Sequence, residues 1–581
     1  MTGGVHEGHA RVRFGGFEAD FRAGELSKRG VKIKLHQQPL EILQILLEHS
    51  GEVVTREELR QKIWPSDTFV DFEQGLYNAV RRLRDALNDS AEKPRFIETL
   101  SRRGYRFIGT VEASVRRIES LAVLPLDNLS RDPEQEYFAE GLTEALITTL
   151  AKIGELRVVS RTSAMQYKGV RKPLSEIARE LGVDAIVEGT VLRANDRVRI
   201  TAQLIDGPRE THLWAESYER DLRDVLSLQA ELAQAIARQV QVKVTPQERA
   251  QLARTQSVDP EAYESYLKGR YHWNRRSGEG LGKAIQCFQQ AIARDPTYAA
   301  AYSGLADCFS SLGWWGFVSP EDGCAKAKGL ARKALELDGG LGEAHASLAW
   351  ATVHYDFDFQ TAEREYERAI ELNPRYATAR FWFGLYLSMM GRDREALAQI
   401  QMSLSLDPLS IIGNGALGMA HYCARRYDQQ IEQLQKTLEL EPNSVHIRWG
   451  LGSGYIGKAM YEPAIAEVRK AVEVSQGAPM FVALLGETYA RAGHSEDARK
   501  ILEQLETSTV AYVSPYVVGG IYAALSEKDE ALRWLDIAYQ EHTAWMAALK
   551  VDPRFDNLRS DPRFKNLLHR MNFPHRLMST S

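Results

Sequence analysis

Apolar and polar residues alternate over two short stretches near the start of the chain, residues 11–21 and residues 31–35. Successive side chains of a strand point to opposite faces, so this alternation predicts half-buried β-strands. Residues 39–48 (PLEILQILLE) change to helical spacing, with Pro39 at the expected helix start. The pattern therefore predicts a domain that begins with strands and continues with helices.

A short second helix is predicted by its cap. Thr55 is followed three residues later by Glu58, which is the spacing of a capping box. We expect this helix to run to about Trp64 and to end at Pro65, since proline cannot continue a helix.

A third helix and a hairpin follow. Helical spacing over residues 73–88 places one apolar stripe on a predicted helix. The stripe consists of Leu76, Val80, Leu83 and Leu87. Residues 95–108 then predict two short strands around the turn sequence SRRG at residues 101–104.

Residues 118–222 mix short apolar runs with amphipathic ones, which predicts a small α/β module. The predicted strands are residues 120–126, 156–160, 185–206 (a hairpin turning at 194–197) and 212–218, and the predicted helices are residues 136–153 and 174–181.

From about residue 260 to 546 the chain repeats a helical pattern every 34 residues. One register holds Ala327, Ala362, Ala396, Gln430, Ala464, Ala498 and Ala531. A single helix pair cannot bury its apolar face, so about eight pairs are expected to stack. The longer step from Ala284 predicts an insertion near residues 313–323. Residues 547–581 contain the motif DPRF twice and are expected to cap the array.

Composition limits the function classes. A chain of 581 residues needs several cores, and a net charge of −5 means that any nucleic-acid surface must be local. There is no apolar run long enough for a membrane span and no signal-peptide pattern, so a cytoplasmic protein is expected. The four cysteines lack metal-ligand spacing, and neither a metal nor another cofactor is expected.

The basic residues are concentrated in one place. Between Arg81 and Arg106 the chain has eight basic and four acidic residues. The planar guanidinium can bond a guanine edge or a phosphate through two hydrogen bonds, so this segment fits a DNA surface. A solvated helix face explains the same charges, and the charge alone leaves both interpretations open.

The residue order favours DNA. VRRLRDAL at residues 80–87, followed by FIETLSRRGYRF at residues 96–107, resembles the C-terminal effector domain of OmpR/PhoB-type response regulators. The resemblance covers residues 11–111. It implies a winged helix with a four-stranded N-terminal sheet, three helices and a hairpin wing. Helix 73–88 would enter the major groove, and the wing, residues 95–110, would reach the adjacent minor groove.

The resemblance also implies which side chains face DNA. The candidate residues are Asn78, Arg81, Arg82, Arg84, Thr99, Ser101, Arg102, Arg103 and Tyr105. Thr99 and Tyr105 match phosphate-contacting positions of the family's wing. Ser101 stands where such wings often carry arginine, so the wing contacts are expected to shift by a residue or two. No receiver domain precedes this region, and input is therefore expected from the C-terminal side.

Two further resemblances concern the rest of the chain. Residues 118–240 resemble an α/β module of bacterial multidomain regulators and are similar in layout to the N-terminal domain of TolB, which implies no activity. Its polar segments 160–163 and 167–169 could line a ligand site, and turn and cap chemistry explains them equally well. The repeats resemble tetratricopeptide repeats, which implies a right-handed superhelix whose concave face binds a peptide or protein segment.

One motif is a false match. Residues 452–457 (GSGYIG) fit GxGxxG, but a dinucleotide site needs that turn between a strand and a helix. Gly452 is in phase with Gly418 and Gly486, which predicts a helix-packing position. Motifs typical of nucleotide-binding, kinase, nucleophilic and metalloprotease sites are lacking, so an enzyme is not expected. Core filling or groove lining is expected for Trp314, Trp315, Trp350, Trp382 and Trp449.

Together these patterns predict a multidomain protein of α/β and all-α parts. The expected domains are a winged helix at residues 1–111, an α/β module at 118–245, repeats at 258–546 and a capping segment at 547–581. We expect a one-component transcriptional regulator that binds double-stranded DNA, as a homodimer, and takes its input through the module and the repeats. The alternative is an interaction scaffold whose winged helix binds protein rather than DNA.

Overall fold

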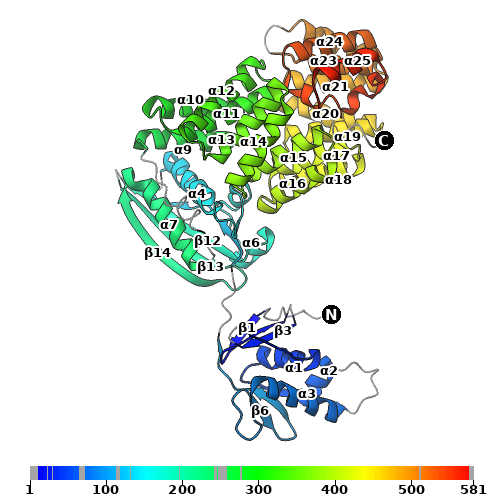
Figure 1. The fold of residues 1–581 in the computed structure, drawn as a ribbon. Coiled ribbons are helices and arrows are strands. Elements are labelled where there is room, and N and C mark those ends of the chain that lie inside the picture. The colour runs from blue at the N-terminus through cyan, green and yellow to red at the C-terminus, as the bar shows by residue number, and fades with distance from the viewer. Residues whose placement is uncertain are drawn as a thin grey trace. The chain divides into compact units, whose positions relative to one another are not determined.

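The computed structural model describes residues 11–21, 24–28, 31–63, 72–112, 118–130, 132–194, 197–240, 245, 258–274, 278–508 and 512–574. The chain divides into two compact units, Met1–Arg117 and Ile118–Ser581 (Figure 1). The first unit holds strands β1–β8 and helices α1–α3, and the second holds the remaining elements.

Residues 11–21 form two strands, so the prediction of a single strand is wrong. β1 (Arg11–Phe14) and β2 (Phe17–Asp20) are antiparallel neighbours. Between them, Gly15 and Gly16 have φ angles of 51° and 82°, which glycine adopts readily. Apolar and polar residues alternate on each side of this turn, with Val12 and Phe14 before it and Phe17 and Ala19 after it, and for that reason the two strands resemble one in the sequence.

The first unit contains two sheets. In the described residues, the first sheet has the order β4-β3-β2-β1-β8, with β3 at Glu25–Lys28, β4 at Val31–Ile33 and β8 at Val111–Glu112. The four-stranded sheet implied by the resemblance thus gains a fifth strand, because Val111 pairs with Phe14. The second sheet has the order β5-β7-β6, with β5 at Val53–Thr55, β6 at Ile97–Leu100 and β7 at Gly104–Phe107.

The helices of the first unit are α1 (Gln37–Glu48), α2 (Arg56–Ile63) and α3 (Phe72–Leu87). Helix α1 begins before Pro39, which is its third residue. The capping box is confirmed: the Glu58 amide donates to Thr55 Oγ1 at 3.2 Å, and the Thr55 amide donates to Glu58 Oε2 at 2.7 Å. The predicted helix end at Trp64 and Pro65 lies outside the described residues.

The second unit begins with the predicted α/β module. Its described sheet has the order β11-β9-β12-β13-β14, and β10 also pairs with β12. The strands are β9 (Ser120–Val123), β10 (Asp127–Asn128), β11 (Arg157–Val158), β12 (Ala185–Ala194), β13 (Arg197–Asp206) and β14 (Thr211–Asp221), and the helices are α4 (Glu136–Leu150), α5 (Arg161–Met165), α6 (Leu174–Leu181) and α7 (Val225–Gln239). Helices α4 and α7 bury one sheet face, and α6 covers part of the other. The hairpin is confirmed, although its turn residues 195 and 196 lie outside the described residues.

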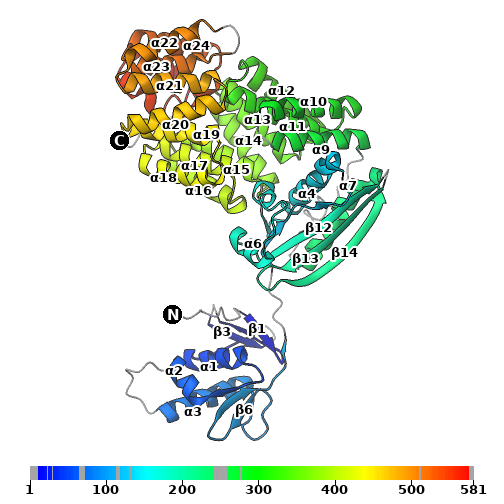
Figure 2. The same cartoon turned by 180° about the vertical axis from the view of Figure 1, so that it is seen from behind.

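The described part of residues 260–540 forms eight helix pairs (Figures 1 and 2). They are α9 (Pro260–Asn274) with α10 (Gly278–Arg294), α11 (Ala299–Trp314) with α12 (Lys326–Leu337), α13 (Gly342–Ala351) with α14 (Phe359–Leu372), α15 (Ala377–Met389) with α16 (Asp393–Leu406), α17 (Ile411–Cys423) with α18 (Tyr427–Leu440), α19 (Val445–Gly457) with α20 (Tyr461–Val474), α21 (Pro479–Arg491) with α22 (Ser495–Glu506), and α23 (Pro515–Ala524) with α24 (Lys528–Gln540). The predicted insertion contains a short π-helix, η3 (Glu321–Ala325), ahead of α12.

Small residues at the helix crossings hold these pairs together. A Cβ on Gly452 would lie 2.3 Å from Val468 Cγ2, and one on Gly418 would lie 2.6 Å from Leu434 Cδ2. Contacts this short do not occur between real side chains, so α19 and α17 need glycine at these positions. The interpretation of residues 452–457 as a packing motif is confirmed.

The segment after the last pair returns to earlier repeats. It consists of the short helices η5 (Ala544–Ala548) and η6 (Pro553–Leu558) and of α25 (Pro562–Arg570). Trp545 Nε1 donates to the Trp314 carbonyl at 3.0 Å, and the two indole rings stack with centroids 4.5 Å apart. The C-terminal segment therefore packs against α11, although the two are separated by more than 200 residues.

Candidate nucleic-acid interface

Helix α3 presents a basic face to solvent because its apolar stripe is buried in the core. Leu76, Val80, Leu83 and Leu87 are buried as predicted, and Ala79 joins them. The opposite face carries Arg81 and Arg82, both exposed, and Asn78, which is half-buried. Neither arginine side chain has a hydrogen bond or ion pair within the described part of the chain.

Arg84, on the same helix, is used differently. Its Nη2 donates to the Ile97 carbonyl at 2.8 Å and to Thr99 Oγ1 at 2.7 Å. These bonds tie α3 to strand β6 of the wing. Arg84 and Thr99 therefore set the position of the wing relative to the helix, through Arg84 Nη2 and Thr99 Oγ1.

The wing turn holds a second pair of unpaired cations. The Arg103 amide donates to the Leu100 carbonyl at 3.0 Å and closes the turn. Ser101, Arg102 and Arg103 are exposed, and in the described residues neither arginine side chain has a partner. Together with Arg81 and Arg82 they form the set called here the free arginines: Arg81, Arg82, Arg102 and Arg103.

Arg102 has a left-handed backbone, with φ of 61°. This conformation is unfavourable by about 1–2 kcal/mol for a residue with a Cβ. Such strain is often found where a side chain serves a function. It keeps a cation at the tip of the wing, where glycine would fit the backbone better.

The base of the wing is built by Gly104 and Tyr105. A Cβ on Gly104 would lie 2.0 Å from the Val54 carbonyl oxygen, so strand β5 can approach only because this residue is glycine. Tyr105 is 4% exposed and belongs to the core, and burial raises the pKa of its hydroxyl. The structure thus separates Tyr105 from the exposed candidates.

Charges elsewhere in the segment are compensated. Arg106 Nε and Nη2 donate to Glu98 Oε2 at 2.8 and 2.6 Å, across the hairpin. Arg56 pairs with Glu73 between α2 and α3. The basic excess predicted from the sequence is therefore concentrated at the free arginines and at the exposed Lys93 and Arg95.

Sequence reasoning missed two residues of this region. Asp89 follows α3, and its carboxylate accepts hydrogen bonds from four backbone amides, those of Ser90, Arg95, Phe96 and Ile97. It fixes the connection from helix to wing. Tyr77 is 58% exposed and lies one turn before Arg81, which its helical spacing from the basic residues could have shown.

The polar segments of the module have identified roles. Ser160 caps α5 by accepting from the Thr162 amide, and the Tyr167 hydroxyl donates to Glu180 at 2.7 Å. Ser163 Oγ donates to Asp407 at 2.6 Å and so joins the module to the repeats. These segments had two interpretations, a ligand site or turn and cap chemistry, and cap chemistry accounts for Ser160. In the described residues we find no cluster of metal-ligand side chains, and no helix with the length and apolar character of a membrane span.

Comparison with known families gives matches for three segments of the chain. Residues 30–107 match the family described as "Transcriptional regulatory protein, C terminal", and residues 117–236 match "HilA/YgeH-like transcriptional regulator, second domain". Residues 348–411 match the tetratricopeptide repeat. The winged-helix and tetratricopeptide predictions are confirmed, and the module is of the HilA/YgeH type. The likeness to TolB stays a prediction.

Individual relatives match parts of this chain over parts of their own length. The chain is 26% identical over 398 residues to the transcriptional regulator HilA of Salmonella typhimurium, which covers 66% of this chain and 68% of that protein. It is 39% identical over 234 residues to a Rhizobium meliloti protein named "Putative adenylate cyclase 3", and this match spans 40% of each chain. The DNA-binding domain of Klebsiella pneumoniae RstA, solved in complex with the RstA box, is 27% identical and covers 17% of this chain and 98% of that chain, with a TM-score of 0.16.

Proposed function

We propose that the protein is a sequence-specific DNA-binding transcriptional regulator, with α3 in the major groove and the wing on the minor groove. One observation carries the proposal: four arginines on the helix and the wing tip are exposed and lack counter-charges in the described residues. Arg84 and Arg106 of the same segment are instead bonded to the fold. Unpaired guanidinium groups are what phosphates and guanine edges require. The matches to transcriptional regulators support the same function.

The geometry divides the candidate residues into two groups. We assign DNA contacts to Asn78, Ser101 and the free arginines, and we add Tyr77 because it is exposed beside Arg81. Positioning is assigned to Arg84, Thr99 and Tyr105, whose side chains are bonded or buried. The proposal thereby replaces the prediction that Thr99 and Tyr105 contact phosphates with a positioning role for both.

The regulatory signal is proposed to reach the DNA-binding domain from the module and the repeats. A protein or peptide partner would bind the repeat array, and the protein would bind DNA as a homodimer. We further propose a cytoplasmic protein without enzymatic activity. The relative with a cyclase name shares 40% of its length with this chain. Incubation of the purified protein with ATP tests this part, since release of cyclic AMP would refute it.

The test of the main proposal is selection of binding sites from a random pool of duplex DNA by the full-length protein. We expect enrichment of one motif, and a decrease in affinity for it in Arg82→Ala by about 1–3 kcal/mol. The matched control is Lys32→Ala, because Lys32 is an exposed cation paired with Glu25 on the other sheet. Equal behaviour of both variants, or no enriched motif, would refute the proposal.

The alternative, a winged helix that binds protein, is supported by the acidic residues beside the basic ones. Asp85 and Glu92 are exposed in the same segment. Occupancy mapping of the tagged protein on its genome separates the two functions: a scaffold captures protein partners and occupies no discrete DNA sites.

A further inference from the structure

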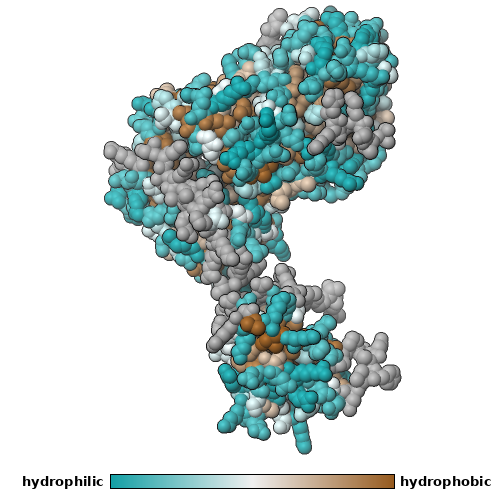
Figure 3. All heavy atoms as spheres, in the orientation of Figure 1, coloured by the Kyte–Doolittle hydropathy of each residue, from teal (hydrophilic) through white to brown (hydrophobic). Residues whose placement is uncertain are grey.

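A layer of tryptophans lies inside the repeat array. Trp350 contacts Trp314 and Trp382, with ring centroids 5.0 and 4.9 Å apart. Trp545 of the C-terminal segment joins Trp314 to Trp449, whose ring centroid is 5.2 Å away. We call these five tryptophans the aromatic layer. On the molecular surface, hydrophobic side chains show between hydrophilic ones over the middle of the array (Figure 3).

A cavity of about 1150 Å³ borders this layer within the second unit. Helices α4 and α5 of the module form one wall, and α11, α15, α17 and α19 contribute to the others. Pockets for small molecules usually measure about 300–1,000 Å³, so there is room for a ligand of several rings. Because the C-terminal segment is packed against the aromatic layer, the chain itself occupies part of the inner side of the array.

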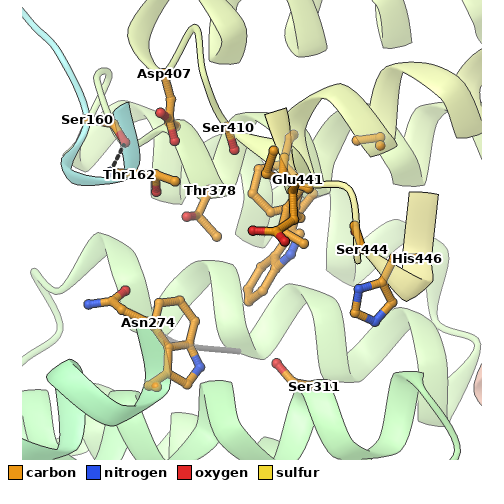
Figure 4. Close-up of a pocket in the computed structure, with 18 of the residues that line it drawn as sticks. Ser160, Thr162, Asn274, Ser311, Thr378, Asp407, Ser410, Glu441, Ser444 and His446 are labelled. Atoms are coloured by element: carbon orange, nitrogen blue, oxygen red, sulfur yellow. Dashed lines mark hydrogen bonds between the residues drawn. The ribbon is translucent and has the colours of Figure 1, made fainter. Parts of the chain in front are cut away.

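The walls carry neutral polar groups from many elements. Figure 4 shows Ser160, Thr162, Thr378 and Ser410 around the same space, with Asn274 and Ser311 across from them. Ser160 and Thr162 belong to the module and the others to the repeats. A ligand in this cavity would therefore touch both parts.

Three of the lining side chains are buried and have an unsatisfied polar atom. Ser310 Oγ, Asn373 Oδ1 and Gln430 Oε1 lack a hydrogen-bond partner within the described residues. The amide nitrogens of Asn373 and Gln430 donate to Glu343 and to the Gly450 carbonyl, so their oxygens are left as acceptors. Buried polar groups are nearly always satisfied, and these acceptors need donors such as hydroxyl groups.

Charged groups at the cavity compensate one another. Glu144 accepts from Arg270 at 2.5 Å and lies 3.3 Å from Arg161 Nε. Arg161 also pairs with Glu140 at 2.6 Å. At the edge of the cavity Arg375 and Glu441 contribute one charge of each sign. With the two other lining carboxylates, Glu279 and Asp407, the cavity has four carboxylates and three arginines, so its lining charges nearly cancel.

We propose that this cavity binds a neutral polyhydroxylated ligand, a saccharide of a few rings. A sugar ring has an apolar C–H face, which suits the indole layer, and a rim of hydroxyls, which both donate and accept hydrogen bonds as the lining groups require. A strongly charged organic ion suits this space less well, because the lining charges of opposite sign nearly cancel. An extended peptide needs an open groove, whereas helices α4 and α5 of the module lie along one side of this space. The inference does not depend on DNA binding.

Binding would strengthen the contact between module and repeats. Direct contacts already join them: for example, Ser163 Oγ donates to Asp407 at 2.6 Å, and Arg157 Nη1 donates to the Ser405 carbonyl at 2.9 Å. A ligand bonded to Ser160 or Thr162 on one wall and to Thr378 or Ser410 on the other adds to this junction. A ligand that binds only the folded state raises the melting temperature, so the proposal can be tested by thermal unfolding.

The experiment measures thermal unfolding and tryptophan fluorescence of the full chain in the presence of maltotriose, cellotriose or raffinose. Each saccharide is used at about 10 mM, which lies above the Kd of a specific ligand of micromolar to millimolar affinity. At least one saccharide should raise the melting temperature by about 2 °C or more. Ser310→Ala removes an unpartnered hydroxyl, so the fold should be retained while affinity falls about threefold to tenfold. Ser303→Ala is the matched control, since Ser303 is a buried serine of α11 outside the cavity lining.

Three outcomes would overturn the proposal. The first is no shift with any of the three saccharides. The second is an equal weakening of saccharide binding in Ser310→Ala and Ser303→Ala. The third is a shift with a neutral octapeptide of alternating serine and alanine, or with citrate, that depends on Ser310 while the saccharides have no effect. Saccharide binding that is weakened by Ser310→Ala and kept by Ser303→Ala supports it.

Discussion

The free arginines of the winged helix and the buried arginines of the repeat array are the same residue type in opposite settings. Arg554 in the C-terminal segment is 8% exposed and forms hydrogen bonds to Asp552 at 2.7 to 3.1 Å. Its charge is neutralised within the fold. The free arginines have no such partner in the described residues, and their charge is available to a ligand. The difference teaches that ion pairing, more than the number of arginines, indicates where a binding surface lies.

The same contrast exists within the first unit. Arg84 is one helical turn from Arg81, yet it is bonded to Ile97 and Thr99. Arg106 lies in the same hairpin as Arg102 and is paired with Glu98. The predictions below test whether pairing separates structural from functional arginines, beginning with the largest effect.

The two DPRF motifs offer the strongest test, because one is buried and the other exposed. Asp552→Ala leaves Arg554 buried without its counter-charge, which is expected to lower the free energy of unfolding by about 3–5 kcal/mol. Asp561→Ala is the matched control: Arg563 is 56% exposed, so the substitution removes an N-cap, worth about 1 kcal/mol, and an exposed ion pair that contributes little. Urea unfolding of both variants gives the two values. Similar values would contradict the distinction between buried and exposed pairs.

Acid should weaken the second unit through His354. This side chain is buried in contact with the aromatic layer, where its Nδ1 lies 2.7 Å from the Trp350 carbonyl. Burial lowers its pKa from 6.5 to about 4, despite that hydrogen bond. The unfolded state binds the proton more readily, so stability present above pH 6.5 is lost between pH 6.5 and 4. The decrease amounts to up to about 3 kcal/mol.

Replacement of this histidine measures its contribution. His354→Asn should flatten the dependence of unfolding free energy on pH in that window, followed by tryptophan fluorescence. His569→Asn, at an exposed position, serves as the control. An unchanged pH profile in His354→Asn would show that another group titrates.

Arg84→Ala tests the structural arginine of the winged helix. It removes hydrogen bonds from a charged donor to Ile97 and Thr99, and we expect the free energy of unfolding to fall by about 1–2 kcal/mol. Arg81→Ala should change stability by less than about 0.5 kcal/mol, since its side chain has no partner in the described residues. Denaturant unfolding of both variants is the measurement. A larger decrease in Arg81→Ala would reverse the assignment of the two residues.

Arg102→Gly is expected to change stability less than Arg84→Ala does. Glycine relieves the left-handed backbone at the tip of the wing, so stability should stay the same or rise by up to about 1 kcal/mol. DNA affinity should fall, because a cation is removed. A thermal melt and a DNA titration of the same preparation measure both quantities. A fall in stability with unchanged affinity would assign Arg102 to the fold.

Local pattern was enough to predict many elements of both units. The stripe of α3, the capping box at Thr55 and the 34-residue period each depend on residues close in sequence, and each is found in the structure. The prediction of one strand over residues 11–21 failed because the two-residue glycine turn was not recognised in the apolar–polar alternation. The candidate basic residues were found by composition and resemblance, which cannot distinguish a free arginine from a bonded one.

Contacts between distant segments were beyond the sequence. The role of Arg84 depends on where strand β6 returns to α3, and that of Asp89 on four amides of the wing connection. The stacking of Trp545 on Trp314 joins residues separated by more than two hundred positions. Such contacts depend on which distant segments pack together in the folded chain, and the periodicity of the sequence carries no information about that packing.

The salt dependence of DNA binding tests the central claim most directly. The logarithm of the affinity of the full-length protein for its selected site should fall steeply as the logarithm of salt concentration rises, by about 0.9 per phosphate bound. The double variant Arg81→Ala, Arg82→Ala should lower this slope by about 0.9 for each phosphate that it no longer neutralises, whereas Lys32→Ala should leave the slope unchanged. A shallow slope in the unmodified protein, or one that the double variant does not alter, would contradict the account.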